Sequence, residues 1–305
     1  MRRRGERPEG EDRDRHRRRI GNRIRHCPGL SAGDIGPGQF SNAKPGHKMS
    51  SDGLFGLRDR VAVVTGGNGG IGLGIAEGLA GAGACVVIAA RNRAKSDAAV
   101  AKLAAMGTQS IALEIDVTLE RDWKLVVQRT LDQYGRIDIL VNNAGVLLGK
   151  PPEEYSLEEW HSVIDTNLTG AFIGSQAVFP EMKRQGGGKI VNIASLTASF
   201  GSPFNVPYTA SKGGIVQLTR GLAAAWAMHN IQVNAISPGW IDTGLASGIR
   251  ARIPGFNEKV VARTPAGRWG RASDLAGVAV FLSSRASDFI TGAAIPVDGG
   301  YSIQL

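Results

Sequence analysis

Two residues with complementary acid–base chemistry, Tyr208 and Lys212, stand four positions apart in the stretch YTASK. In a helix, residues at i and i+4 project from one face, so the phenol and the ammonium would be neighbours. An ammonium beside a phenol favours the phenolate and lowers a pKa that is otherwise about 10. Such a tyrosine can move a proton near neutral pH, which predicts a general acid/base. On spacing alone, the two residues also fit an ordinary pair on a helix surface.

Two further polar residues, Ser195 and Asn167, are candidates for the same site. Ser195 directly follows the apolar run 189–194, and Asn167 lies inside a helix that the pattern predicts over 157–184. Each also fits a purely structural role. Ser195 could be an ordinary hydroxyl at a strand end, and Asn167 could be a helix-capping or buried amide.

A glycine-rich stretch, TGGNGGIG at 65–72, follows the apolar run VAVVT at 61–65 and precedes a predicted helix. Glycine permits positive φ and lets backbone N–H groups approach a pyrophosphate at a helix N-terminus. A glycine-rich loop in this strand–loop–helix context predicts a dinucleotide site. The spacing is TGxxxGIG and differs from the GxGxxG of the commonest dinucleotide binders.

The elements that must position these residues alternate regularly along the chain. Parallel strands buried on both faces read as continuous β-branched runs, and alternation with helices indicates right-handed βαβ units. We therefore predict an α/β fold, a single Rossmann-type doubly wound parallel sheet of seven strands with helices on both faces. Ligands of such sheets bind beyond the carboxyl ends of the strands. The predicted strands are 61–65, 85–90, 110–115, 137–142, 189–194, 231–236 and 293–297, and the predicted helices lie near 71–82, 94–106, 120–134, 157–184, 208–229 and 273–284.

The part of the chain from about residue 54 to residue 305 resembles the short-chain dehydrogenase/reductase family. The motifs that carry the resemblance occur in the family's order: TGGNGGIG, NNAG, Asn167, Ser195, YTASK and Pro238-Gly239. The resemblance implies hydride transfer between a nicotinamide and a secondary alcohol or ketone. The alternative of another class is a regulatory protein that binds a dinucleotide without turnover. In such proteins the set Asn167, Ser195, Tyr208 and Lys212 is usually incomplete, whereas all four are present here.

The resemblance also implies a role for each of four residues. Tyr208 would be the general acid/base, and Ser195 would form a hydrogen bond with the substrate oxygen. Lys212 would bind the nicotinamide ribose and lower the pKa of Tyr208. Asn167 would hold the water that links Lys212 to solvent for proton relay.

The cofactor site implied by the resemblance consists of residues that follow the strands. The glycine loop would bind the pyrophosphate, the third strand end the adenine, the fourth the ribose, and the sixth the carboxamide and phosphates. In that order the residues are Gly66, Asn68, Gly70, Ile71 and Gly72; Asp116 and Val117; Asn143, Ala144 and Gly145; and Pro238, Ile241 and Thr243, joined by Arg91, Tyr208 and Lys212. Asp116 also fits a strand cap.

The choice between NADP and NAD depends on the end of the second strand. NAD-preferring members usually carry an Asp where this chain has Ala90, and Arg91 follows. A carboxylate would repel a 2′-phosphate, whereas a guanidinium binds one through charge-assisted bonds. Against this, NADP users often carry a second basic group where this chain has Asn68, and Arg91 could stack on adenine. We predict NADP in preference to NAD.

The substrate is less defined. Between 244 and 271 there are six basic residues and one acid, an excess that could attract an anionic substrate or form a solvated or subunit-contacting face. The stretches at 150–160, 188–201 and 264–270 look similar to gluconate and 2-deoxygluconate dehydrogenases, and overlap with glucose dehydrogenases and 3-oxoacyl carrier-protein reductases. A sugar or sugar acid is the first prediction, and a 3-oxoacyl thioester is the alternative. The basic residues are Arg250, Arg252, Lys259, Arg263, Arg268 and Arg271, and Trp240, Trp269 and Phe204 could line a pocket or pack in the core.

The net charge of +9 belongs mostly to the first 48 residues, which hold thirteen basic and six acidic residues. The Arg-rich opening run, with almost no apolar residues, is predicted to be disordered, and the predicted domain, 49–305, begins at Met49. We predict that 1–48 is a non-functional extension that results from an over-long gene start; a nucleic-acid-binding arm is the less favoured alternative.

Composition and family resemblance give the remaining expectations. Two cysteines make neither a disulfide framework nor a zinc site, which favours a cytoplasmic protein without a structural metal. No apolar run approaches the length of a membrane span. The resemblance implies a homotetramer that uses the helices at 157–184 and 208–229 and the last strand, with Phe172, Phe179 and Trp226 facing either a partner or the core.

Overall fold

The computed structural model describes residues 53–244 and 254–304 of the chain. The predicted N-terminal extension, residues 1–48, and the basic residues Arg250 and Arg252 lie outside the described residues. Within the described ranges, no helix combines the length and the apolar composition that crossing a bilayer would require.

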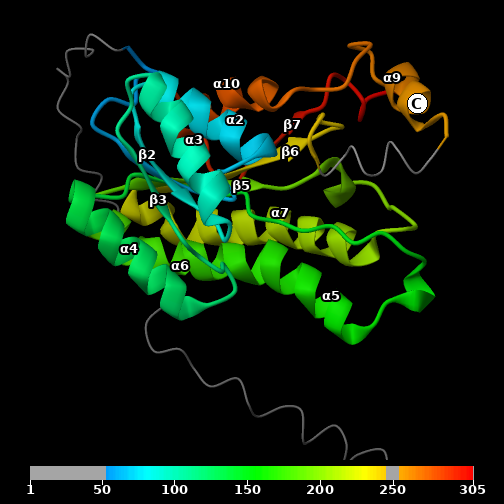
Figure 1. Ribbon diagram of the computed structural model, residues 1–305, viewed down its shortest axis with the longest axis horizontal. Helices are drawn as coiled ribbons and strands as arrows, with labels where there is room; N and C mark the ends of the chain where they lie inside the picture. The colour runs from blue at the N-terminus through cyan, green and yellow to red at the C-terminus, as the bar shows by residue number, and fades with distance from the viewer. Residues whose placement is uncertain (1–52, 245–253, 305) are drawn as a thin grey trace, which may run out of the picture. The chain divides into compact units, whose positions relative to one another are not determined.

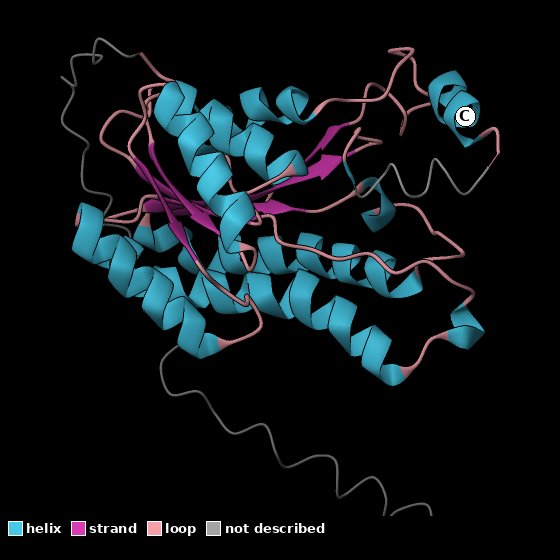
Figure 2. Ribbon diagram, viewed as in Figure 1, coloured by secondary structure: helices cyan, strands magenta, loops and turns pink. Residues whose placement is uncertain are grey.

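One sheet of seven strands, in the order β3-β2-β1-β4-β5-β6-β7, forms the middle layer of the domain. All neighbouring strands are parallel, and helices cover both faces (Figure 2). The predicted Rossmann-type doubly wound fold is confirmed. The strands are β1 (Val61–Thr65), β2 (Cys85–Ala89), β3 (Ser110–Leu113), β4 (Ile139–Asn142), β5 (Gly188–Ile193), β6 (Ile231–Pro238) and β7 (Ala294–Val297).

The strand order reverses at β1, because β2 pairs with one edge of β1 and β4 pairs with the other. The chain winds from β1 to β3 in one direction and from β4 to β7 in the other. A doubly wound sheet has its ligand crevice at this switch point, outside the carboxyl ends of the strands. The glycine-rich loop follows β1 and the NNAG stretch follows β4, so the two predicted cofactor segments meet at this crevice.

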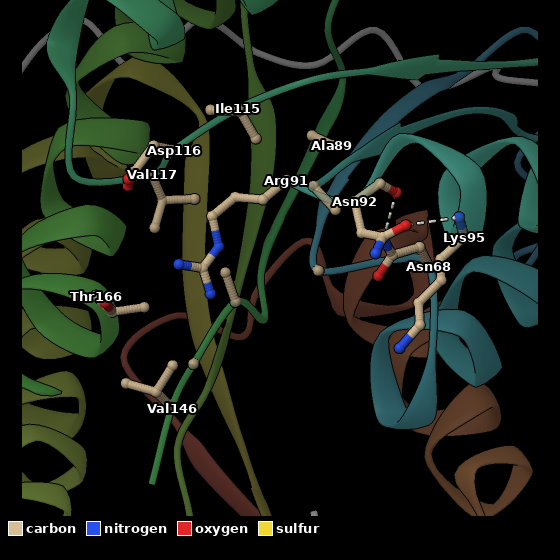
Figure 3. A pocket seen from close by; sticks show the side chains of 14 residues that line it. Asn68, Ala89, Arg91, Asn92, Lys95, Ile115, Asp116, Val117, Val146 and Thr166 are labelled. Carbon is tan, nitrogen blue, oxygen red and sulfur yellow. Dashed lines mark hydrogen bonds between the residues drawn. The ribbon is translucent and has the colours of Figure 1, made fainter. Parts of the chain in front are cut away.

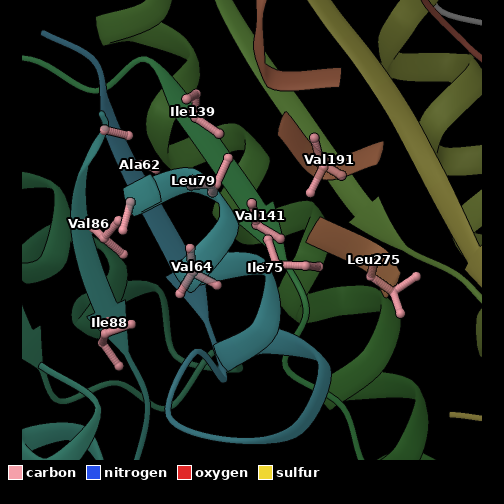
Figure 4. Packing of buried hydrophobic residues seen from close by; sticks show 14 of the residues in the cluster. Ala62, Val64, Ile75, Leu79, Val86, Ile88, Ile139, Val141, Val191 and Leu275 are labelled. Atoms are coloured by element: carbon pink, nitrogen blue, oxygen red, sulfur yellow. The ribbon is translucent and has the colours of Figure 1, made fainter. Parts of the chain in front are cut away.

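The helices form two layers, seen above and below the sheet in Figure 1. In the upper layer, Ile75 and Leu79 of α2 pack with Val64, Ile88 and Val141 of the sheet, and all five are fully buried (Figure 4). Burial of such apolar side chains is the dominant favourable contribution to folding. The upper layer consists of α2 (Gly70–Gly81), α3 (Arg93–Ala105) and α10 (Ala276–Ser283), and the lower layer of α4 (Glu120–Tyr134), α5 (Leu157–Ile164), α6 (Gly170–Arg184) and α7 (Val206–Trp226).

The structure differs from the predicted elements in two places. The helix predicted over 157–184 is interrupted between α5 and α6 by a π-helical turn, η2 (Asp165–Thr169), which contains Asn167. A single π turn between two α-helices was not distinguished from a continuous helix by the sequence pattern. The second difference is α9 (Phe256–Arg263), a helix in the segment for which no element was predicted.

Candidate active site

The glycine-rich loop leads into α2. Its N-cap residue is Gly69, so within the described residues no N-cap side chain bonds to the first N–H groups of the helix. Gly66 and Gly70 adopt φ of +62° and +50°, a region that glycine occupies without strain. A Cβ at Gly72 would collide with the Gly66 carbonyl and the Asn143 amide, whereas a Cβ at Gly69 would meet no described atom within 4 Å. The first N–H groups of a helix have no intrahelical acceptor, and this donor set fits a pyrophosphate.

Asn143 and Thr65 join the two strand ends at the switch point. The Asn143 side chain donates to the carbonyl of Thr65 at 2.9 Å and to that of Gly66 at 3.2 Å. The Thr65 hydroxyl accepts the backbone N–H groups of Asn143 and Ala144 at 2.9 and 3.0 Å. The side-chain N–H groups of Asn143 are thus occupied in shaping the glycine loop, so a ribose contact from this side chain would use its oxygen atom.

Beside the loop lies a cavity of about 220 Å³ across the carboxyl ends of β1 to β4. Figure 3 shows the Arg91 side chain extending across it towards Val117 and Thr166, with Asn68, Asn92 and Lys95 on the opposite side. The cavity contains the predicted cofactor residues from the first four strand ends together with several that were not predicted. Its lining is Gly66, Asn68, Ala89, Ala90, Arg91, Asn92, Lys95, Ile115, Asp116, Val117, Ala144, Gly145, Val146 and Thr166.

The sequence prediction missed Asn92 and Lys95, which belong to the N-terminus of α3. Asn92 caps this helix by accepting the Lys95 N–H at 2.9 Å. The first turn contains Arg93 and Lys95, although a helix N-terminus carries partial positive charge and disfavours cations. Basic residues at such a place were the available signal for an anion site. Asn68 contributes from the glycine loop, because its amide donates to the Ser96 hydroxyl of α3 at 3.0 Å.

Asp116 and Val117 follow β3 and form the wall of the cavity opposite Asn92. Bonds from the Thr118 N–H and hydroxyl, at 3.0 and 2.8 Å, together with the nearby Arg91 charge, lower the pKa of Asp116. The Asp116 carboxylate also acts as the local turn cap, so the structural role considered for it is present. The buried Val117 accepts the indole N–H of Trp123 through its carbonyl at 3.0 Å, which leaves its side chain on the cavity wall.

Tyr208 and Lys212 project from the same face of α7, as their spacing predicts, with the Lys212 Nζ 5.5 Å from the centre of the Tyr208 ring. Lys212 is only 4% exposed, and its ammonium donates to the Ile193 carbonyl at 2.6 Å. Burial lowers the pKa of Lys212 to about 8. Two charge-capable side chains are therefore held together at the end of β5.

The phenol of Tyr208 differs from the sequence expectation in the direction of its shift. Burial raises the pKa of Tyr208, and a hydrogen bond with Ser195 lowers it in part. The Ser195–Tyr208–Lys212 cluster is nevertheless assembled as predicted, since Ser195 lies within hydrogen-bonding reach of the phenol.

Asn167 lies in the π turn, and its amide is fully used. It donates to the Val146 carbonyl at 3.0 Å and to the Ser211 hydroxyl at 3.1 Å, and it accepts the Val146 N–H at 2.8 Å. Ser211 in turn donates to the Tyr208 carbonyl at 2.7 Å. Asn167 thus connects the loop after β4 to the helix of Tyr208. Both of its side-chain N–H groups are therefore occupied, so a water that it holds would bind to an oxygen atom of this residue.

The segment after β6 covers the glycine loop from the other side. A Cβ at Gly70 would lie 3.4 Å from the Thr243 methyl, which places Thr243 against the N-terminus of α2. Ile241 is 5% exposed and forms a parallel bridge with Gly270. Pro238 ends β6, so the predicted carboxamide- and phosphate-binding segment lies beside the predicted pyrophosphate site.

The three aromatic residues that were considered as pocket lining do not lie together. The ring centres of Trp240 and Trp269 are 5.7 Å apart in an edge contact, and both rings pack against α9. Phe204 is exposed in the loop before Tyr208. Two of the basic residues considered as anion attractors already have partners. Arg268 pairs with Asp274 at 2.7 Å, and Arg263 lies 4.6 Å above the Tyr301 ring.

Comparison with known proteins agrees with this geometry. A family model described as "enoyl-(acyl carrier protein) reductase" matches residues 66–302. The gluconate 5-dehydrogenase of Gluconobacter oxydans is 41% identical over 260 residues, covering 84% of this chain and all of that protein. The 5-keto-D-gluconate 5-reductase of Escherichia coli K12 is 40% identical over 252 residues, covering 83% of this chain and 99% of that protein.

A solved structure extends the comparison to the fold. The gluconate 5-dehydrogenase of Burkholderia cenocepacia J2315, in complex with NADP and tartrate, superposes with a TM-score of 0.79 at 38% identity. The match covers 83% of this chain and 98% of that one. The similarity therefore extends over most of the described residues.

Proposed function

The chain belongs to the short-chain dehydrogenase/reductase family, and from that premise we propose that it interconverts a keto sugar acid and its hydroxy acid with NADP. It is an oxidoreductase that acts on CH–OH groups. The observation that carries the proposal is the Ser195–Tyr208–Lys212 cluster at the end of β5, beside a cavity that contains Arg91 and Lys95.

The residues of the cluster divide the acid–base chemistry among them. When bound, the nicotinamide supplies or accepts the hydride. In the reducing direction, Tyr208 gives its proton to the substrate oxygen, and Ser195 holds that oxygen by a hydrogen bond. The Lys212 ammonium then stabilises the phenolate that remains, because an adjacent positive charge favours the charged form of the phenol. Asn167 fixes the loop after β4 against α7, which keeps the reacting groups at a constant separation.

NADP is proposed over NAD because two basic side chains, Arg91 and Lys95, line the adenosine end of the cavity. Position 90 is an alanine, so no carboxylate stands there to repel a 2′-phosphate. The Lys95 cation in the first turn of α3 would be stabilised by a bound phosphate at the helix N-terminus. The relative from Burkholderia cenocepacia is in complex with NADP, which supports the same choice.

Sugar acids are proposed as substrates because the relatives are named for gluconate and 5-keto-D-gluconate. The tartrate in the complex of the Burkholderia cenocepacia relative is also a hydroxy acid. In this chain, Lys259 remains an exposed cation near the carboxyl edge, since α9 follows the segment after β6. A 3-oxoacyl thioester is the second candidate, and the acyl-carrier-protein description of the matching family model favours it.

The cofactor proposal is tested by comparing NADP with NAD in the wild type, Arg91→Ala and Lys95→Ala. Loss of a charge-assisted contact to the 2′-phosphate costs about 1.5–3 kcal/mol, or about ten- to a hundredfold. We expect the KM for NADP to rise by that factor in each variant, while the KM for NAD stays almost constant. Arg93→Ala is the matched control, since Arg93 lies in the same turn and pairs with Asp97 at 2.8 Å. An equal loss with both cofactors would mean that Arg91 only stacks on adenine.

We also propose a homotetramer in a cytoplasmic setting. Phe172 on α6 is 43% exposed, and Phe289, which precedes the edge strand β7, is fully exposed. Edge strands and exposed apolar side chains are commonly covered by a second copy of the chain. Phe179 and Trp226 instead stack on each other at 4.6 Å and pack against the core. Light scattering at micromolar concentration checks the assembly, and a monomer would contradict it.

A further inference from the structure

Two loops at the carboxyl edge of the sheet connect to the catalytic cluster. The loop after β4, residues 143–156, contains Val146, which is bonded to Asn167. The loop after β5, residues 195–205, begins at Ser195 and ends at α7, the helix of Tyr208. Both loops extend beyond the strand ends to the right in Figure 1. Any movement of one loop relative to the other therefore alters the surroundings of the reacting groups.

The hydroxyl of Tyr155 bridges these two loops. It lies 2.6 Å from the carbonyl oxygen of Leu148 in the first loop and 3.1 Å from that of Phe204 in the second. The same Phe204 carbonyl accepts the backbone N–H of Lys150 at 2.8 Å. One hydroxyl proton shared between two acceptors, together with the backbone bond, holds Leu148 and Phe204 at a fixed separation.

The ring of Tyr155 is itself held in place from α5. The Lys150 ammonium lies 5.5 Å from the centre of the ring and 2.6 Å from the Glu159 carboxylate. Glu159 belongs to a capping box with Ser156 at the N-terminus of α5. The contacts on both sides of Tyr155 therefore connect the bridge to a regular helix, which limits the rotation of the phenol.

We propose that Tyr155 and Lys150 are positioning residues that join the two loops into one wall of the substrate site. Leu148 and Phe204 are 36% and 61% exposed, so the joined loops carry two exposed apolar side chains beside the segment that begins at Ser195. Exposed loops with few buried contacts open at small free-energy cost, and a bridge between them lowers the ordering cost of binding. The assignment of this wall to substrate depends on the proposed function, whereas the bridge itself does not.

The role in binding is tested with Tyr155→Phe, which removes only the hydroxyl. A net hydrogen bond corresponds to about a three- to tenfold change in an equilibrium constant. We expect the KM for the carbonyl substrate to rise by that factor, while kcat and the dissociation constant of NADPH change less than about twofold. Tyr134→Phe is the matched control. Tyr134 lies at the C-terminal end of α4 and packs with the hydrophobic residues between the sheet and the lower helix layer. An unchanged KM in Tyr155→Phe would overturn the positioning role.

The bridge is tested separately by amide hydrogen exchange, which needs no substrate. In Tyr155→Phe, we expect the amide of Lys150 to exchange about three- to tenfold faster than in the wild type, with Tyr134→Phe unchanged. Unaltered exchange at Lys150 would overturn the bridge even if turnover fell. If the wild type reduced no sugar acid, the proposed function would fail. The KM comparison would then use whichever carbonyl the wild type reduces, and the exchange result would still decide the bridge.

Discussion

Lys212 lies at a buried position, where a charged side chain costs free energy. The residue is 4% exposed, and within the part of the chain that the structure describes its ammonium donates to the carbonyl of Ile193. Burying an ammonium costs free energy unless it is paired, which is why its pKa falls to about 8. A strongly perturbed group beside Tyr208 and Ser195 is a mark of a functional site. A surface tyrosine–lysine pair, the alternative from spacing alone, would show none of this burial.

The assignment of Tyr208 as the proton donor predicts the effect of Tyr208→Phe. The ring and its packing remain, so NADPH should bind with nearly normal affinity by fluorescence titration. Turnover should fall by about 10²–10⁴, the usual contribution of general acid–base catalysis. A variant that kept more than about a tenth of the wild-type kcat would contradict the role.

The buried ammonium of Lys212 predicts a pH-dependent difference in stability. Its pKa is 10.5 in its ordinary state and about 8 in the folded chain. Between these values the unfolded chain binds more protons, so this group makes the folded chain more stable as pH rises from about 8 to 10.5. Below that window, the full penalty of burying the charge is present.

Lys212→Met removes this dependence. We compare the Tm of Lys212→Met with that of the wild type, both measured without cofactor. The Tm of the variant relative to the wild type should decrease as the pH rises from about 7 to about 9.5, because only the wild type gains stability from this group. Lys124→Met is the control, because Lys124 is exposed on α4 and its replacement should leave a constant difference. A constant difference for Lys212→Met as well would contradict the assigned pKa.

Among individual residues, the sequence predicted those whose chemistry is visible in the residue type. Ser195, Tyr208 and Lys212 meet as expected, because parallel strands end at one edge and i, i+4 residues share a face. Lys95 was missed, since its relevance depends on α3 beginning at the cavity. The two hydrogen bonds from the Asn143 side-chain nitrogen were also not predictable, because their acceptors are backbone carbonyls 77 and 78 positions away.

At the scale of elements, buried strands were the easiest to predict. A short, uninterrupted β-branched run such as VAVVT in β1 is typical of a parallel strand that is buried on both faces. The π turn η2 was not predictable in this way. It is associated with tertiary bonds from Asn167 to Val146 and Ser211, which no local pattern encodes. Helix α9 was not predicted, because the basic residues of its segment were considered only as a substrate-attracting or surface feature.

The packing of α4 against α6 gives a test at this scale. A Cβ at Gly174 would penetrate the ring of Trp123, which is 1% exposed. Gly174→Ala should therefore overpack the lower layer and destabilise the fold by about 1–3 kcal/mol. Gly277→Ala on α10 is the matched control, since its added Cβ would meet no described atom within 4 Å. We expect a lower Tm for the first variant and an equal or higher Tm for the second; equal Tm values would contradict the packing.

At the scale of the whole molecule, the charge distribution separates the N-terminal segment from the enzyme. Residues 1–48 carry a net charge of +7 out of the +9 of the whole chain, and the domain that follows is nearly neutral. The seven-stranded sheet, the crevice and the catalytic cluster all lie within residues 53–304. Removal of residues 1–48 is therefore expected to leave kcat/KM unchanged. A loss of activity in the shortened chain would show that the segment contributes to the site.

The central claim is that the crevice reduces a keto sugar acid with NADPH. The most direct test follows NADPH absorbance with the purified protein, using 5-keto-D-gluconate, glucose-derived neutral sugars and a 3-oxoacyl thioester in parallel. We predict saturable oxidation of NADPH by 5-keto-D-gluconate, with kcat/KM at least about a hundredfold above that of either competitor. Turnover of the thioester with no activity towards the sugar acid would contradict the claim.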